Sequence, residues 1–207
     1  MKGNHSLEKE FNFVSVLKII IVLAIIGAII FGIIMLVMNH IKKAKIEEDI
    51  STVIDNSFTA LKNLDKEKVN KYLDYNKLIS GLDEMLIKEE DTNIEKELFK
   101  DITWAIENIE VNNDEAIVIV ELTNKSFKNI LTKWMKDLIA EVNNGNQIAE
   151  EGAINKLEEI VKKEEDNKVE LKKVKFKKIE DTWKIEVNDD FIDLVFPGID
   201  SVTEILN

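Results

Sequence analysis

The chain has 207 residues, of which 28 are lysines and 40 are acidic, with no arginine, two histidines and no cysteine. Residues 1–45 hold six Lys and two Glu, which leaves 22 Lys and 38 acidic residues in the remainder, a net charge near −16. A field of that sign repels phosphate backbones, so we expect no nucleic-acid partner. Both histidines, His5 and His40, precede residue 46. Beyond that point Ser-His and Cys-His catalysis, thiol redox chemistry and Cys or His zinc sites are therefore excluded.

A run of twenty apolar residues dominates the beginning of the chain. It extends from Ile19 to Met38 without a charge or a proline. As a helix it reaches ~30 Å, the thickness of a bilayer's hydrocarbon core, and it predicts a transmembrane helix over 19–38. A cleaved signal peptide is the alternative, but its apolar core is usually ~7–15 residues long and ends in small residues, whereas this run ends in Met-Asn-His. We therefore predict an uncleaved anchor between a short tail, 1–18, and a basic juxtamembrane segment, 39–45.

The side of the membrane is less directly encoded. Lysines are nearly balanced on the two sides of the apolar run, at positions 2, 9 and 18 before it and 42, 43 and 45 after it. A short tail before a first span more often stays in the cytoplasm, so we expect the acidic domain, residues 46–207, on the extracellular side of the cell membrane. The lack of cysteine agrees with an exported domain.

Helical patterns follow the predicted span. Apolar residues recur at three and four over residues 44–64, which predicts an amphipathic helix that leaves the membrane directly. A coiled-coil stalk is the alternative, but the pattern lasts under three heptads, so we expect this helix to pack on its own domain. Asp65 is placed to cap a second helix, 66–75. Capping-box spacings at 80–83 and 92–95 predict two further helix starts.

The period then changes to that of strands. Apolar residues alternate over 102–111 with a shift of one, as a bulge near Asn108 would cause. Residues 112–114, Asn-Asn-Asp, predict a turn, and residues 116–122 form an almost unbroken β-branched run. We expect a hairpin whose second strand is buried on both faces.

Two helices are predicted next. Residues 127–142 have helical spacing and end at an Asn-Asn-Gly C-cap, 143–145. A second helix fits 147–163, and the charged segment 164–168 predicts a solvated turn.

Another hairpin is predicted near the end of the chain. Val169 and Leu171 alternate with charged residues, and after a one-residue slip Val174 and Phe176 continue the alternation. The return strand contains Trp183, after which Pro-Gly at 197–198 ends an element that includes two phenylalanines, and residues 201–204 predict a last helical turn. The expected class is α+β: an N-terminal transmembrane helix, then helices packed on a curved antiparallel sheet of about four strands, with a helical insertion.

Few residues qualify as a functional site. Trp104, Trp134 and Trp183 each lie on the predicted apolar face of their element. Core packing is the common role of such residues, and a hydrophobic ligand pocket lined partly by them is the alternative. Glu107 and Glu121 lie near strand ends and could serve as general bases with raised pKa values, although a strand glutamate more often faces solvent.

No metal site or cofactor is expected. When Gly145 is aligned with the central glycine of a calcium loop, Ala140 and Val142 fall where ligands belong. The acidic pair Asp189-Asp190 is more typical of a solvated surface than of a calcium site. The scattered glycines provide no phosphate-binding loop.

The order of helices, hairpin, helices and hairpin resembles a known superfamily, and local sequence adds to the likeness. The residues concerned are Phe176-Lys-Lys-Ile-Glu-Asp-Thr-Trp183-Lys-Ile185, together with Ala60, Leu61, Asp65, Tyr72 and Leu73. Over residues 45–200 the chain looks like the membrane-anchored extracytoplasmic domains of Gram-positive bacteria with the nuclear-transport-factor-2-like (cystatin-like) fold. The resemblance implies a curved sheet around the N-terminal helices, enclosing a cone-shaped pocket. No catalytic residue carries over, and the helical region 127–163 departs from the simplest members.

Two functions therefore remain open. The first is a non-catalytic envelope protein whose domain binds a small apolar ligand or a protein partner at the cell surface. The second is a pocket enzyme of the ketosteroid-isomerase type that uses a carboxylate base. A buried carboxylate beside a wet, tryptophan-lined cavity would favour the enzyme, whereas a filled core with acids only on its surface would favour the binding module.

Overall fold

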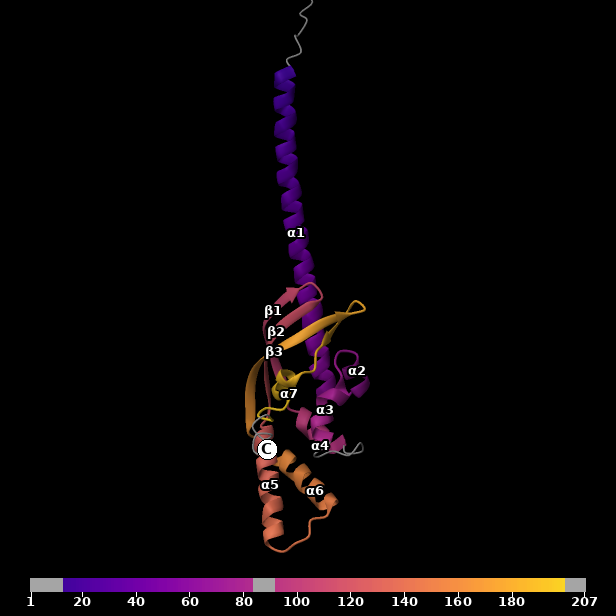
Figure 1. Cartoon of the computed structure of the whole chain (residues 1–207), viewed down its shortest axis with the longest axis vertical. Helices are drawn as coiled ribbons and strands as arrows, with labels where there is room; N and C mark the ends of the chain where they lie inside the picture. Colours follow the sequence, from indigo (N-terminus) through magenta and orange to yellow (C-terminus); the bar gives the residue numbers. More distant parts are fainter. Residues whose placement is uncertain (1–12, 84–91, 200–207) are drawn as a thin grey trace, which may run out of the picture. The chain divides into compact units, whose positions relative to one another are not determined.

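A computed structural model describes residues 13–83 and 92–199, and it places side chains over 24–80 and 93–199. The chain forms two compact units, Met1–Lys45 and Ile46–Asn207. The described residues form seven helices and four strands (Figure 1). The fold is therefore α+β, as predicted.

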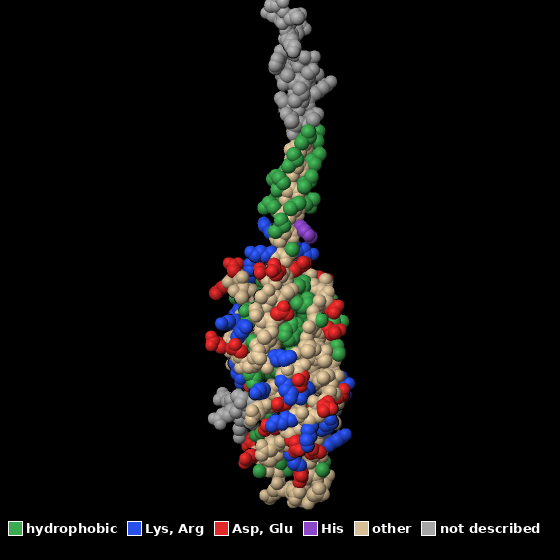
Figure 2. All heavy atoms as spheres, turned by 180° about the vertical axis from the view of Figure 1, so that it is seen from behind, with side chains coloured by type: hydrophobic (Ala, Val, Ile, Leu, Met, Phe, Trp, Pro, Cys, Tyr) green, Lys and Arg blue, Asp and Glu red, His purple; other side chains and the backbone are tan. Residues whose placement is uncertain are grey.

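Helix α1, Phe13–Lys62, contributes to both units. The predicted helix over 19–38 lies within it. Among the described residues, α1 is the one helix long and apolar enough to cross a membrane, and its most apolar stretch is not buried by the rest of the chain. The exposed apolar side chains form the green band in Figure 2. They are the large aliphatic, aromatic and methionine residues from Ile25 to Ile41.

The last turns of α1 belong to the second unit and build its core. Ile50, Ile54, Phe58 and Leu61 are each no more than 1% exposed. Their spacing of four, four and three puts them on one face of the helix. The prediction that this helix packs on its own domain is confirmed.

Three short helices follow, and their boundaries correct the prediction. Asp65 accepts a hydrogen bond from the Lys68 amide at 3.0 Å, so the predicted cap of α2 is confirmed. However, α2 covers only Lys66–Asn70 and does not reach residue 75. The Asn70 side chain accepts from the Tyr75 amide at 3.0 Å, which starts the next helix there.

Helix α3, Tyr75–Asp83, begins earlier than the capping-box spacing at 80–83 predicted. Asp74 accepts from the Lys77 amide at 3.0 Å and so occupies the capping role, while Ser80 lies inside the helix and donates to the Lys77 carbonyl. The predicted start at residue 92 is confirmed by α4, Thr92–Phe99.

The four strands form one antiparallel sheet in the order β1-β2-β3-β4. They are β1 Thr103–Asn112, β2 Glu115–Lys125, β3 Asn167–Ile179 and β4 Thr182–Ile185. The β1–β2 register shifts between Ile106 and Asn108, so the predicted bulge is confirmed. Asn113 adopts φ of 55° in the turn, a conformation that asparagine tolerates well.

Two predictions about these strands are wrong. Strand β2 is not buried on both faces: buried and more accessible residues alternate along it, and Ile117 is 40% exposed. Strand β3 contains no slip, because its register with β2 is unbroken from Glu115–Lys177 to Lys125–Asn167. Val169 and Leu171 consequently lie on the face opposite to the buried Val174 and Phe176.

A helical hairpin connects β2 to β3, which confirms the predicted insertion. It consists of α5, Phe127–Asn143, and α6, Glu150–Lys163. The predicted C-cap is confirmed, with Gly145 at φ of 79°. Glu164 is 4% exposed, so the expected solvated turn is wrong at this residue.

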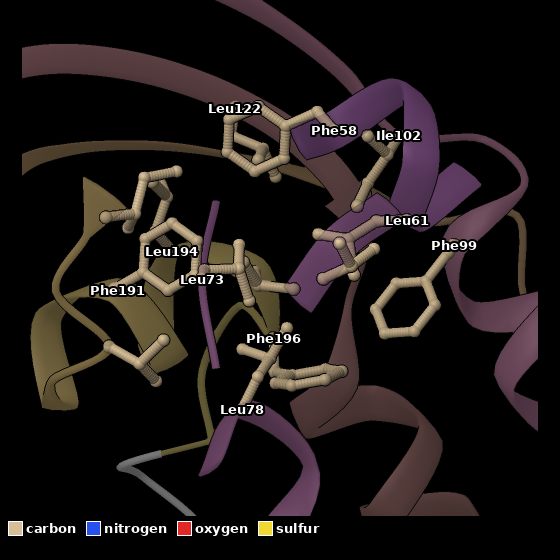
Figure 3. Close-up of a cluster of buried hydrophobic side chains, with 14 of the residues drawn as sticks. Phe58, Leu61, Leu73, Leu78, Phe99, Ile102, Leu122, Phe191, Leu194 and Phe196 are labelled. Carbon is tan, nitrogen blue, oxygen red and sulfur yellow. The ribbon is translucent and has the colours of Figure 1, made fainter. Parts of the chain in front are cut away.

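Helix α7, Asp189–Val195, follows the sheet and ends before Pro197. The acidic pair at 189–190 lies exposed in its first turn, where carboxylates favour the helix dipole. The predicted helical turn at 201–204 lies outside the described residues. Figure 3 shows the centre of the core, where α1, α3, α4, β2 and α7 direct apolar side chains toward one another.

Candidate binding surface

The three tryptophans of the predicted pocket lie in three different environments. Trp104, on β1, is half-buried, donates its indole hydrogen to Asp55 at 2.8 Å and packs against Phe58 with ring centroids 5.4 Å apart. Trp134, on α5, donates to the Ala153 carbonyl at 2.8 Å and so joins α5 to α6. Trp183, on β4, is 4% exposed within the core. The indoles of Trp104 and Trp134 therefore join elements of the fold, and Trp183 is packed in the core.

Aromatic side chains fill the space beside Trp104. The Phe58 ring stacks on Phe191 with centroids 6.2 Å apart, and Phe196 contacts both Phe99 and Phe127 at 5.7 and 5.4 Å. These rings come from α1, α4, α5 and α7 and the residue that caps α7, and Figure 3 labels four of them, Phe58, Phe99, Phe191 and Phe196. They form a continuous packed core in the described part of the domain.

Buried carboxylates are paired with lysines. Glu95, with a side chain 4% exposed, lies 2.9 Å from Lys66 Nζ, and that ammonium also lies over the Tyr75 ring. Glu164, 2% exposed, accepts from Lys133 at 2.8 Å. Both buried carboxylates therefore have a lysine ammonium within hydrogen-bonding distance.

A third pair ties β3 to α7. Lys172 Nζ donates to Asp193 at 2.6 Å, and the Asp193 side chain is 9% exposed. The hydrogen bond that Lys172 donates to Asp193 raises the pKa of Lys172 above its ordinary value of 10.5. Asp193 also accepts from the Gly198 amide at 3.3 Å. The arrangement fixes the end of α7 on the inner face of the sheet, which is the face that packs against α1 and α7.

One lysine is itself buried. Lys125, at the end of β2, has a side chain 3% exposed and donates to the Val161 carbonyl at 2.8 Å, with Asp101 3.8 Å away. It joins the sheet to the last turn of α6. Among the described residues, no three His, Cys, Asp or Glu side chains gather as metal ligands.

The other face of the sheet, the outer face, is the most unusual surface of the domain. Val169 is 59% exposed and Leu171 58%, and Ile117 and Ile119 lie on the same face of β2, opposite Lys175 and Lys173. Glu121, one of the carboxylates proposed as a base, is exposed on this face directly opposite Leu171. Glu107, the other one, is exposed at the bulge of β1. The solvated interpretation of both carboxylates is thus the one that the structure supports.

Charges on the outer face are segregated by strand. Glu110, Glu115 and Glu121, which we call the acidic row, lie on β1 and β2. Lys173, Lys175 and Lys177, the lysine row, lie on β3. All six side chains are exposed, and of the ion pairs between described residues none involves the lysine row. The acidic half of this face, β1 and β2, therefore adjoins the basic strand β3, and the apolar side chains lie within the two rows: Ile117 and Ile119 are opposite Lys175 and Lys173, and Leu171 is opposite Glu121.

Shallow hollows mark the same surface near the β1–β2 turn. Two adjoin at Ile117, one bounded by Glu110 on β1 and the other by Lys175 and Lys177 on β3. A third lies elsewhere, between Tyr72 and β4. No tryptophan lines any of the three.

Sequence reasoning missed this surface because it treated the apolar residues of β3 as core. The available signal was the regular alternation of Lys173, Lys175 and Lys177 with Val174 and Phe176, which places the lysines on the face opposite to the core. If the alternation is continued toward the N-terminus without a slip, Leu171 falls on the same face of β3 as the three lysines. No family model matches this chain, and no curated protein or solved structure is similar enough to it to suggest a relative.

Proposed function

We propose that this chain is a single-pass membrane protein that presents residues 46–207 on the outer side of the cell membrane as a non-catalytic, partner-binding domain. The observation that carries the proposal is the apolar stretch of α1. Its large side chains, from Ile25 to Ile41, are 45–71% exposed, while the apolar residues at the end of the same helix are buried. Exposed apolar area of that extent is unfavourable in water and favourable in lipid.

Cell fractionation tests the anchor. We expect the full chain to sediment with membranes, to resist alkaline carbonate and to dissolve in detergent. The matched control replaces Ile26, Ile30 and Ile34 by Lys, because charges at the centre of a span are costly. That variant is expected in the soluble fraction. Recovery of the unmodified chain in the soluble fraction would contradict the proposal.

Protease treatment of intact cells tests the side of the membrane. We expect degradation of residues 46–207 without cell lysis, and the same degradation after lysis. Protection in intact cells, lost on lysis, would put the domain in the cytoplasm and overturn the proposed orientation.

Binding rather than catalysis is supported by the state of the buried carboxylates. Glu95, Glu164 and Asp193 each have a lysine partner within 3 Å. The described core holds packed aromatic rings beside Trp104. Kinship with the nuclear-transport-factor-2-like superfamily is part of the proposal; the helix packed against a four-stranded antiparallel sheet supports it.

A polarity-sensitive dye such as anilinonaphthalene sulfonate tests for a pocket. A filled core predicts no saturable site in the domain, so dye fluorescence with the unmodified chain in detergent should show no saturable increase over the same detergent without protein. A saturable site removed by Trp104→Ala or Trp183→Ala, in variants that remain folded by circular dichroism, would favour the enzyme hypothesis.

A further inference from the structure

The outer face of the sheet has a property beyond its exposure: its charge pattern is self-complementary. The half formed by β1 and β2 carries the acidic row, and the adjoining strand β3 carries the lysine row; Ile117 and Ile119 lie in the first half, and Val169 and Leu171 lie on β3. A surface whose two halves have opposite charge can bind a copy of itself if the two copies are turned so that unlike halves meet.

We propose that the outer face binds the outer face of a second copy of this chain, forming a two-fold symmetric dimer. The proposal names the partner of the binding domain proposed above and so rests on that function. The contact buries the exposed Val169 and Leu171 and places the lysine row, which has no ion pair within the described chain, over the half of the other copy that carries the acidic row.

Charge selects one orientation of the two copies. When a face packs on itself with two-fold symmetry, the axis must lie in the plane of contact. An axis across the strands would place β1 on β1 and β3 on β3, so that acids meet acids and lysines meet lysines. An axis along the strands, between β2 and β3, places β2 of each copy over β3 of the other. Only this second arrangement brings unlike charges together.

The register of the sheet then gives the facing residues. Positions paired across β2 and β3 within one chain lie at the same level along the axis, so Glu115 of one copy faces Lys177 of the other, and Ile119 faces Lys173. Stacked sheets lie about 10 Å apart with their strands nearly aligned, as this axis requires. Membrane anchoring favours the contact further, since it raises the effective concentration of one copy near another.

The absence of cysteine from the chain makes the arrangement directly measurable. A Leu171→Cys variant of the full chain, in bilayer nanodiscs or native membranes, is treated with a bis-maleimide spanning about 10 Å, the spacing of stacked sheets. Residues on β2 and β3 lie close to the axis, so we expect a cross-linked dimer. A Thr103→Cys variant, two strands from β3 at the far edge of the sheet, is expected to cross-link much less.

Charge reversal tests complementarity. In the Leu171→Cys background, Lys173, Lys175 and Lys177 are changed to Glu in one variant, and Glu110, Glu115 and Glu121 to Lys in another. Each face then carries one sign, so each variant alone should lose at least about tenfold in dimer yield. Mixed, the two variants should cross-link to each other. The matched control reverses Lys77, Lys128 and Lys136, exposed lysines outside the sheet, and should retain the dimer.

The outcomes separate the two proposals. A monomeric unmodified chain, or dimers equally abundant in every charge variant, would overturn the face-to-face arrangement; the second result would assign the contact to the anchor helices. Both leave the membrane anchor intact, because anchoring is read by sedimentation of the same variants with membranes. A chain that dimerises by complementarity but fails to sediment would instead overturn the anchor.

Discussion

The two faces of the sheet are built from the same strands, and both carry large apolar residues, yet only one face is buried. On β2, Val118 and Val120 of the inner face are fully buried, whereas Ile117 of the outer face is 40% exposed. On β3, Phe176 is 2% exposed and Leu171 58%. The difference lies in what covers each face, since α1 and α7 pack on the inner one. A hydrophobic residue in a strand is therefore evidence for a strand more than evidence for burial.

Truncating a leucine on the inner face should change the free energy of unfolding more than any other substitution considered for this comparison. Leu122 is fully buried on β2, so Leu122→Ala should lower the free energy of unfolding by about 2–5 kcal/mol through lost transfer energy and a cavity. Leu171→Ala, the matched control on the outer face, should change it by no more than about 0.5 kcal/mol in the monomer. Urea denaturation in detergent, followed by tryptophan fluorescence, measures both. Equal losses would show that the outer face is covered.

A buried ion pair gives the next largest effect. Lys133→Ala leaves the Glu164 carboxylate buried without its ammonium, and the free energy of unfolding should fall by about 1–3 kcal/mol. Adding Glu164→Gln should recover part of that loss, because a neutral amide needs no counter-charge. A double variant as unstable as Lys133→Ala would show that the pair contributes through packing instead.

Alkaline pH probes the pair that fixes α7 on the inner face. Because Asp193 raises the pKa of Lys172 above 10.5, the folded state holds that proton more tightly than the unfolded state does. The stabilisation is complete below pH 10.5 and is lost as pH rises through the folded-state pKa. Unfolding measured between neutral pH and pH 12 should therefore show a steeper loss for the unmodified chain than for Lys172→Met. Parallel curves would contradict a raised pKa.

The smallest effect is expected at the helical hairpin, where the charges are exposed. Hydrogen bonds from Lys156 at 2.6 Å and Asn146 lower the pKa of Glu141 below 4.5. This contribution is present above pH 4.5 and is lost as pH falls through the folded-state pKa. The variant Glu141→Gln should thus lose slightly less stability on acidification, which thermal unfolding at neutral and acidic pH can measure. A larger acid sensitivity in the variant would reverse the assigned sign.

Local signals predicted much of the fold. The spacing of Ile50, Ile54 and Leu61 predicts a helix face from the sequence alone, because helical periodicity depends on residues that are close together in the chain. The cap at Asp65 and the bulge before Asn108 also depend on residues within a few positions of each other. Such features need no knowledge of the distant chain.

Features set by distant contacts were missed. The slip predicted in β3 assumed that Val169 and Leu171 must be buried, and only the helices that cover one face show otherwise. Glu164 looked like part of a charged turn, yet Lys133, thirty-one positions away, makes its burial tolerable. The outer face as a binding surface was missed for the first of these reasons.

The bulge between Ile106 and Asn108 bears on how the protein avoids aggregation. An edge strand exposes unpaired backbone groups that can recruit a strand of another molecule, and a bulge interrupts that template. At the opposite edge, β4 has only four residues, which is too short to template extensive pairing. The bulged β1 edge is thus a poor site for strand addition. Crowded copies on a membrane would meet through a face whose specificity comes from side chains, and not through an edge that any extended backbone could join.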